Sequence, residues 1–156
     1  MNASQVSEVE LLKAFFDSPL SQKGTHPLKN GIEIGLNITD SAPLTLTKSK
    51  GTILILEGSP KSPDMTFWIG KKGVRQLVEV ETNDIGEVGI AIIKLMLAED
   101  PEVRLKSKVH IGTLQLLTHG YLSIVPLGGS TVMKFLASKG FSNIGKIKDA
   151  ISHLRG

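Results

Sequence analysis

The stretch Asp64–Gly73 reads DMTFWIGKKG, and it joins a short apolar strand to a helix through glycine. After the aspartate the residues are mainly large and apolar, which favours a strand over Asp64–Gly70. Gly70 and Gly73 then punctuate the chain, and we expect a short helix over Gly73–Val80. The neighbouring elements are organised around this strand-to-helix turn.

A second stretch, Tyr121–Gly140, has the same order of elements. We predict a strand over Tyr121–Leu127, a turn at Gly128-Gly129 and a helix over Ser130–Lys139 that begins with a capping serine. Neither stretch holds a nucleophile elbow, a metal-ligand cluster or a phosphate-binding loop. We therefore expect function to reside in apolar surface rather than in reactive side chains.

Composition limits the class of protein. A length of 156 residues indicates one domain with a substantial core. The absence of cysteine excludes disulfides, thiolate metal sites and cysteine nucleophiles. The net charge of +3 is too small to indicate nucleic acid without a concentrated basic patch. We see no secretory signal and no apolar run of the roughly 20 residues that a bilayer span needs, so we expect a soluble cytoplasmic protein without a cofactor.

The first part of the chain predicts one helix and three strands. Ser7 and Glu10 have the spacing of a capping box, which favours a helix over Ser4–Phe16 that begins at Ser7 or at Ser4. The segment Leu20–Asn30 has no periodicity and is expected to be a loop. Apolar stretches separated by short turns then predict an antiparallel meander, over Gly31–Thr39, Pro43–Lys50 and Thr52–Glu57. The third stretch is almost wholly apolar, which indicates burial on both faces.

The helix expected over Asp84–Glu99, which Asp84 can cap, is apolar around most of its circumference. Such a helix is buried in a core, packed in a dimer or lining an apolar cavity, and the sequence leaves these three interpretations open. A helical turn over Thr113–His119 and a terminal helix over Ile144–Leu154, within residues 143–156, complete the expected helices.

A basic stripe lies on the strand-like segment 103–110, where Arg104, Lys106 and Lys108 alternate with apolar or small residues. Lysines of this kind keep an edge strand from pairing with other chains, and we favour this interpretation. The same stripe could make transient contact with an anionic membrane surface. Nucleic acid is the least favoured partner, because we expect no exposed aromatic side chains between the basic ones.

The sequence shows no grouping of reactive side chains that is typical of a catalytic or metal site. No two of the four histidines have a short metal-ligand spacing, and we expect structural or surface roles for all of them: His26, His110, His119 and His153. The Gly128-Gly129-Ser130 turn could bind an anion at a helix start, but we favour a tight turn with a serine cap.

Two motifs and the order of elements resemble the sterol carrier protein type two (SCP-2-like) sterol-binding domain. In that family an Ala/Pro-Asp-x-Thr strand leads into a short helix, and here Pro63–Ile69 (PDMTFWI) leads into Val74–Val80. The family also has a Gly-x-Leu-x-Ile strand followed by a helix that starts at glycine. Here the corresponding residues are Gly120-x-Leu122-x-Ile124, followed by Gly128-Gly129 and Val132–Ala137.

The resemblance covers residues 31–141 of a single domain over 1–156. Residues 84–109 are an inserted helix and strand-like segment, longer than the family pattern. Gly70-Lys71-Lys72-Gly73 stands where the family usually has an acidic or serine cap.

The resemblance implies an α+β fold with a mixed five-stranded sheet covered by helices, and an apolar tunnel or core between them. It implies non-catalytic binding or transport of a lipid, such as a fatty acid, acyl-coenzyme A, sterol or phospholipid. The expected lining residues are large side chains of the sheet and of several helices: Phe67, Trp68, Leu77, Ile92, Met96, Leu117, Met133, Phe135 and Leu136.

Two other functions stay open at this point. A protein-interaction module on the same fold would have a filled core and a homodimer interface on the helix Asp84–Glu99 or Ile144–Leu154. A less favoured alternative is an enzyme that uses His119 or the Gly128-Gly129-Ser130 turn. An open apolar tunnel favours the lipid carrier, a filled interior favours the interaction module, and His119 facing a carboxylate within a cleft favours the enzyme.

Overall fold

The computed structural model describes residues 7–138 and residue 140. Within this part of the chain five strands form one sheet with the order β3-β2-β1-β4-β5. The strands are β1 (Glu33–Ile38), β2 (Leu44–Ser49), β3 (Thr52–Glu57), β4 (Met65–Ile69) and β5 (Leu105–Val109). The helices are α1 (Glu8–Asp17), α2 (Pro19–Thr25), α3 (Lys71–Val78), α4 (Ile85–Leu97), α5 (Thr113–Thr118), the 3-10 helix η2 (Val125–Gly128) and α6 (Gly129–Ser138).

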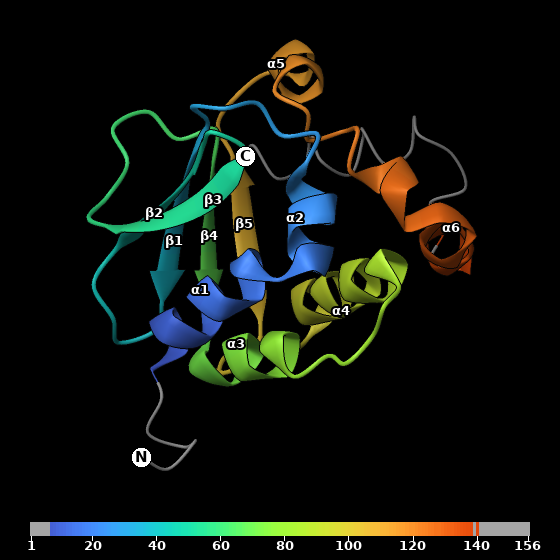
Figure 1. The fold of residues 1–156 in the computed structure, drawn as a ribbon. Helices are drawn as coiled ribbons and strands as arrows, with labels where there is room; N and C mark the ends of the chain where they lie inside the picture. Colours follow the sequence, from blue (N-terminus) through green and yellow to red (C-terminus); the bar gives the residue numbers. More distant parts are fainter. Residues whose placement is uncertain (1–6, 139, 141–156) are drawn as a thin grey trace.

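The sheet is mixed. The strands β1, β2 and β3 form the expected antiparallel meander, β4 runs parallel to β1, and β5 runs antiparallel to β4. Helices α1 to α4 lie over one face of this sheet, whereas α5 lies at its end and α6 lies beyond α4 (Figure 1). The predicted fold class, α+β with a five-stranded mixed sheet covered by helices, is confirmed.

Pairing register divides the strand residues between an inner face, toward the helices, and an outer face. In the parallel pair, Leu36 lies beside Phe67 and Asn37 beside Trp68. The inner-face residues of the central strands are mostly buried aliphatic side chains: Ile34, Leu36, Ile38, Leu44, Leu46, Met65 and Ile69. They pack with Leu12, Val74, Leu77 and Leu95 of the helices. A core therefore fills the space between sheet and helices here.

The fifth strand is not the one predicted. The expected strand over Tyr121–Leu127 is wrong, because these residues form a series of turns and the helix η2. Their backbone N–H groups bond to carbonyls three residues back, as in Leu127 N–H to Ile124 O at 3.0 Å. The basic strand-like segment supplies the fifth strand, β5, at the edge of the sheet. The expected position of the basic stripe on an edge strand is thus confirmed.

The edge strand β3 differs from its prediction in burial. Ile53 is buried on the inner face, but Leu54 and Leu56 point to the outer face and are 41% and 48% exposed. The expected burial on both faces is therefore wrong. A continuous apolar run suits a strand covered on both sides, and here no described helix covers the outer side.

The loop predicted over Leu20–Asn30 is partly helical, since α2 spans Pro19–Thr25. Ser18 caps its start by accepting the N–H of Ser21, and proline occupies the first turn. At the other end Lys48 of β2 reaches across. Its Nζ donates to the carbonyl oxygens of Thr25, His26 and Leu28 at 3.0, 2.9 and 2.7 Å. A lysine from the sheet thus satisfies the end of a seven-residue helix that lacks apolar periodicity.

Lys48 is only 5% exposed although it carries an ammonium group. Burial lowers the pKa of Lys48, because leaving water disfavours the charged form. The three carbonyl oxygens replace part of the lost hydration. The side chain therefore holds α2 against β2.

We expect Lys48→Met to destabilise the fold by about 2 kcal/mol or more, because it keeps the aliphatic stem but leaves three carbonyls without their donor. Urea unfolding followed by circular dichroism measures this change. Lys23→Met, on the exposed surface of α2, is the matched control and should change the free energy of unfolding by less than about 0.5 kcal/mol. Equal stabilities of the two variants would contradict the assigned role.

Candidate functional site

The lining residues predicted on the sheet lie on opposite faces. Phe67 points to the inner face and packs, partly buried, against the core. Trp68 points to the outer face, away from the helices, and is 41% exposed. One strand cannot direct adjacent side chains into the same interior, because successive residues alternate between faces.

The lining residues predicted on α3 and α4 lie closer together. Leu77 of α3 is buried in the core, and Ile92 of α4 packs against the same core. Met96 is half-buried on α4. The other four are on α5 and α6. Leu117 is 51% exposed and Met133 is exposed, whereas Phe135 is half-buried. Leu136 is buried in a second cluster, apart from the core on which Phe67 packs.

The apolar circumference of helix α4 is explained by its packing, because different sides of the helix contact different neighbours. On one side Val88, Ile92 and Leu95 pack into the core of the sheet. On another side Ile90 and Ile93 pack on a second cluster formed by Val132 and Leu136 of α6. The side chain of Asp84 caps the helix start by accepting the N–H of Gly86 at 2.8 Å, as the sequence predicted. A further strip of α4 faces α3 across a groove.

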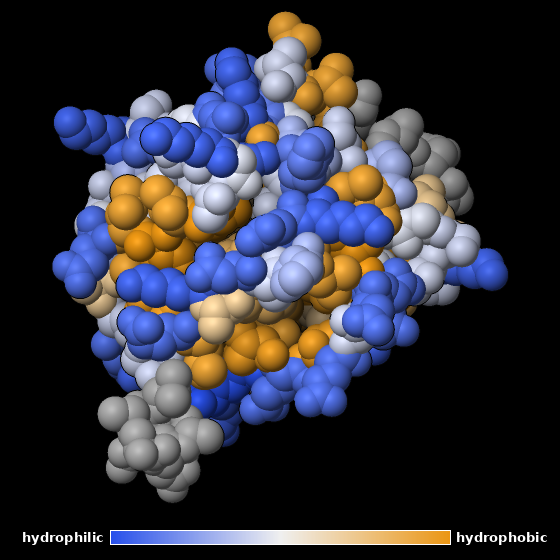
Figure 2. Space-filling model, in the orientation of Figure 1, coloured by the Kyte–Doolittle hydropathy of each residue, from blue (hydrophilic) through white to orange (hydrophobic). Residues whose placement is uncertain are grey.

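This groove is the candidate site. It has a volume of about 590 Å³ and runs between α3 and α4. Its lining is largely aliphatic: Leu77, Val80, Ile90, Ala91, Leu95, Ala98 and Val103. The polar groups that border it are Gln76, Glu87, Lys94 and Thr131. Figure 2 shows hydrophobic surface breaking through hydrophilic surface over α3 and α4. Of the nine predicted lining residues, Leu77 lies in this groove.

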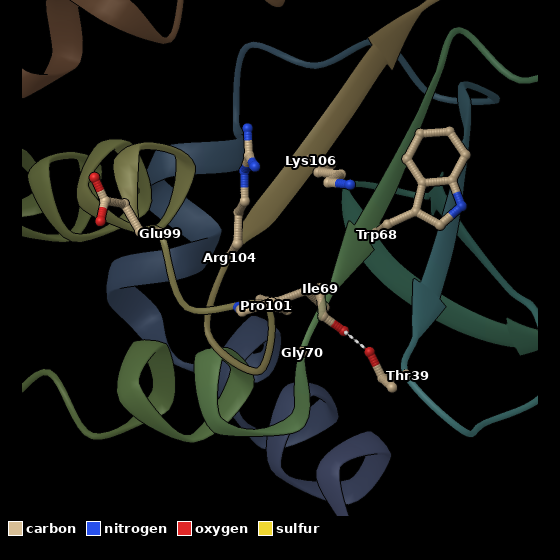
Figure 3. Close-up of a pocket in the computed structure, with 8 residues that line it drawn as sticks. All are labelled: Thr39, Trp68, Ile69, Gly70, Glu99, Pro101, Arg104 and Lys106. Atoms are coloured by element: carbon tan, nitrogen blue, oxygen red, sulfur yellow. Dashed lines mark hydrogen bonds between the residues drawn. The ribbon is translucent and has the colours of Figure 1, made fainter.

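A smaller pocket of about 210 Å³ lies beside β5 on the outer face of the sheet (Figure 3). Trp68, Arg104 and Lys106 contribute its aromatic and basic groups. Thr39, Ile69, Gly70, Glu99 and Pro101 complete the lining. The pocket differs in chemistry from the groove, because cations and an indole replace aliphatic side chains.

Asp64, the aspartate of the Pro-Asp-x-Thr motif, is buried at the start of β4. Its Oδ2 accepts hydrogen bonds from His119 Nδ1 at 2.7 Å and from the Tyr121 hydroxyl at 2.9 Å. Gly120 lies between these two partners with φ of +93°, and a Cβ there would overlap the carbonyl oxygen of Pro27. Only glycine permits this turn without strain or collision, so Gly120 directs both neighbours onto Asp64.

The expected sign of an enzyme is met only in part. His119 faces a carboxylate, but neither Asp64, His119 nor Tyr121 lines the groove or the smaller pocket. His110 is engaged elsewhere, with Nε2 2.8 Å from Thr66 Oγ1. His153 and the predicted terminal helix over Ile144–Leu154 lie outside the described residues.

Helix α6 begins at Gly129, so the prediction that Ser130 caps it from outside is wrong.

The described residues offer neither a metal site nor a membrane span. No group of three or more His, Asp or Glu side chains there could hold a metal ion. No helix in residues 7–138 has the length and apolar character to cross a bilayer.

No protein-family model matches the chain, and no curated protein matches it. Among solved structures, the chain is similar to one described as "UbiJ-SCP2 Ubiquinone synthesis protein". The sequence identity is 16% and the TM-score is 0.43, over 78% of this chain and 84% of that chain. So distant a likeness does not establish a family, and membership of the sterol carrier family stays a prediction.

Tyr121 gives the Asp64 cluster a measurable pH dependence. Burial raises the pKa of Tyr121 well above its usual value of 10.0, and the hydrogen bond to Asp64 raises it further. Above pH 10 the unfolded phenol loses its proton while the folded one keeps it. The free energy of unfolding should therefore fall, by about 1.4 kcal/mol per pH unit from this group.

Urea unfolding between neutral pH and pH 11, on the native chain and on Tyr121→Phe, measures this effect. The variant should lack the contribution, so its stability should fall less steeply above pH 10. The lowered pKa of Lys48 acts in the opposite direction, but it acts equally in both proteins. The chain has one tyrosine, so ultraviolet absorbance of tyrosinate follows this group directly. Ionisation near pH 10 in the folded protein would contradict the prediction.

Proposed function

We propose that the domain binds the apolar chain of a lipid in the groove between α3 and α4 and catalyses no reaction on it. The space between the sheet and the helices is filled, and this alone favours the interaction module. The observation that supports lipid binding is the groove between α3 and α4, which is lined by seven aliphatic side chains and is bordered by four polar ones. Small-molecule sites commonly have this composition and a volume of about 300–1,000 Å³.

Apolar burial supplies the affinity in this proposal. Each methylene that leaves water for the groove contributes about 0.8 kcal/mol. Six such groups would contribute about 5 kcal/mol before the cost of association is subtracted. The aliphatic lining cannot orient a ligand, so orientation has to come from the polar border.

Lys94 is the cation on that border, and Gln76 of α3 adds an amide. An ammonium and an amide can both donate to a carboxylate or a phosphate. Glu87, about two helical turns nearer the start of α4 than Lys94, would repel an acidic head group from its own end. An anionic lipid would thus lie with its head group toward Lys94. Fatty acids, acyl-coenzyme A and phospholipids share this chemistry, and carriage of such a lipid between sites is the cellular role that fits it.

Ala91→Trp tests the groove directly. Ala91 lines the groove from α4, and an indole there would occupy the space of several methylenes. We expect the affinity for a fluorescent fatty acid to fall about tenfold or more, which corresponds to the loss of about two buried methylenes. Fluorescence titration gives the dissociation constants.

Ala14→Trp is the matched control, because it adds the same side chain to the exposed surface of α1. It should leave the affinity unchanged. Thermal unfolding shows whether each variant is folded, and Ala98→Trp, at the C-terminal end of α4, replaces Ala91→Trp if the latter does not fold. Binding that survives both groove substitutions in folded proteins would exclude the groove as the site.

Native mass spectrometry of the protein purified from its own cells, before and after organic extraction, identifies the bound lipid. A lipid that leaves on extraction would give the ligand class. A clean protein mass, together with no uptake of fluorescent fatty acid, would refute lipid binding. If that mass were the mass of a dimer, the homodimerisation alternative would replace the proposed function.

A further inference from the structure

Register places an unusual set of side chains on the outer face of the sheet. Trp68 of β4 lies directly across from Lys106 of β5, and Lys108 lies across from Thr66. Arg104 precedes β5 on the same alternation. These side chains are exposed on the face opposite to helices α1 to α4. We call Trp68, Arg104, Lys106 and Lys108 the outer-face patch.

The patch carries uncompensated positive charge. Within the described part of the chain, no carboxylate forms an ion pair with any of its three cations. Glu99 lines the smaller pocket together with Trp68, Arg104 and Lys106. Its side chain follows the end of α4 and points away from Trp68 (Figure 3). Glu102 is engaged with Lys72 at 2.7 Å. Glu33, at the start of β1, also points to this face.

Trp68 adds an apolar and amphipathic group to this charge. Large aromatic residues in a small domain are normally buried, yet this indole is 41% exposed beside lysine. Tryptophan side chains favour the boundary between lipid head groups and acyl chains, where the ring is apolar and the N–H stays hydrated. Leu54 and Leu56 are exposed on the same face at the other edge of the sheet.

We propose that the outer-face patch docks the protein on an anionic lipid bilayer. The charges and the indole are both needed: the three cations attract the negatively charged surface, and Trp68 enters its interfacial layer. The charge of the whole chain is only +3, so attraction depends on the concentration of cations in this one place. Docking does not require the groove to be occupied, and it is therefore independent of the proposed function.

The geometry nevertheless connects the two sites. Val103 lines the groove between α3 and α4, and Arg104, the next residue, lines the smaller pocket beside Trp68. Just after the end of α4, Ala98 likewise lines the groove and Glu99 lines the smaller pocket. The connection between α4 and β5 thus separates the groove from the docking surface. A protein docked through Arg104 holds one end of its groove close to the bilayer.

Single-stranded nucleic acid is the other polyanion that the patch could meet. The expectation that no exposed aromatic accompanies the basic stripe is wrong, because Trp68 lies beside Lys106. Strand-binding proteins, however, stack successive bases on several aromatic side chains. The single tyrosine is hydrogen-bonded to Asp64, and Phe15 and Phe16 lie on α1 at the opposite face. A bilayer fits one indole among three cations better.

Vesicle flotation tests the proposal. The full chain is mixed with vesicles of phosphatidylcholine alone or of phosphatidylcholine with phosphatidylserine. We expect binding only to the second kind, and loss of binding when salt rises from about 0.1 M to about 1 M and the screening length falls from about 10 Å to 3 Å. Trp68 is the only tryptophan, so a blue shift of its fluorescence reports entry of this residue into the interface.

Charge removal provides the variant and its control. Lys106→Gln with Lys108→Gln should lower the partition coefficient about 25-fold, at about fivefold for each charge near the surface. Lys23→Gln with Lys134→Gln removes the same charge from α2 and α6 and should have little effect. Ala91→Trp should still dock, which separates a failure of docking from a failure of lipid uptake in the groove.

Three results would overturn the proposal. The first is equal binding to both kinds of vesicle, or to neither, by folded protein. The second is equal loss of binding in the two double variants. The third is a blue shift produced just as well by soluble glycerophosphoserine, by inorganic phosphate or by a single-stranded oligonucleotide, because the patch would then recognise a free anion or a nucleic acid rather than a surface.

Discussion

The parallel pairing of β1 with β4 determines which residues in the middle of the chain face the helices. In this register Leu36 and Phe67 share the inner face, and Asn37 and Trp68 share the outer one. A slip of one residue would exchange the two sets and bury an indole beside lysines. The core, the position of α3 and the exposed tryptophan all depend on this one alignment.

Helix α4 extends the same core to the second half of the chain. Because nearly every side of it is apolar, it can pack on the sheet, on α6 and along the groove at once. Two of the three interpretations of its sequence, a buried helix and a cavity wall, are therefore not exclusive, whereas packing in a dimer stays a prediction. Here the partner on the second side is α6 of the same chain. Groove and core share this helix as a wall, so the candidate site is built on a packed element rather than on a loop.

Local signals in the sequence predicted the meander, β4, α3, α4 and the cap at Asp84, because period, glycine and capping residues act within a few positions. The errors arose where the local structure depends on residues that are distant in the sequence. Helix α2 ends on Lys48, a residue of β2, and Leu54 is exposed because no described helix covers its side. The Gly120-x-Leu122-x-Ile124 pattern looked like a strand, but Gly120 turns the chain so that Tyr121 reaches Asp64. The groove is lined by side chains from α3, α4, the segment before β5 and α6, which no single motif contains.

The enclosure of Lys48 also has a kinetic meaning. An ammonium held by three carbonyls inside the protein cannot meet an amine-directed reagent until α2 and β2 separate. The exposed lysines carry no such restriction. Selective modification of Lys48 would therefore occur only in molecules that have opened locally, and its rate would report how often the helix leaves the sheet.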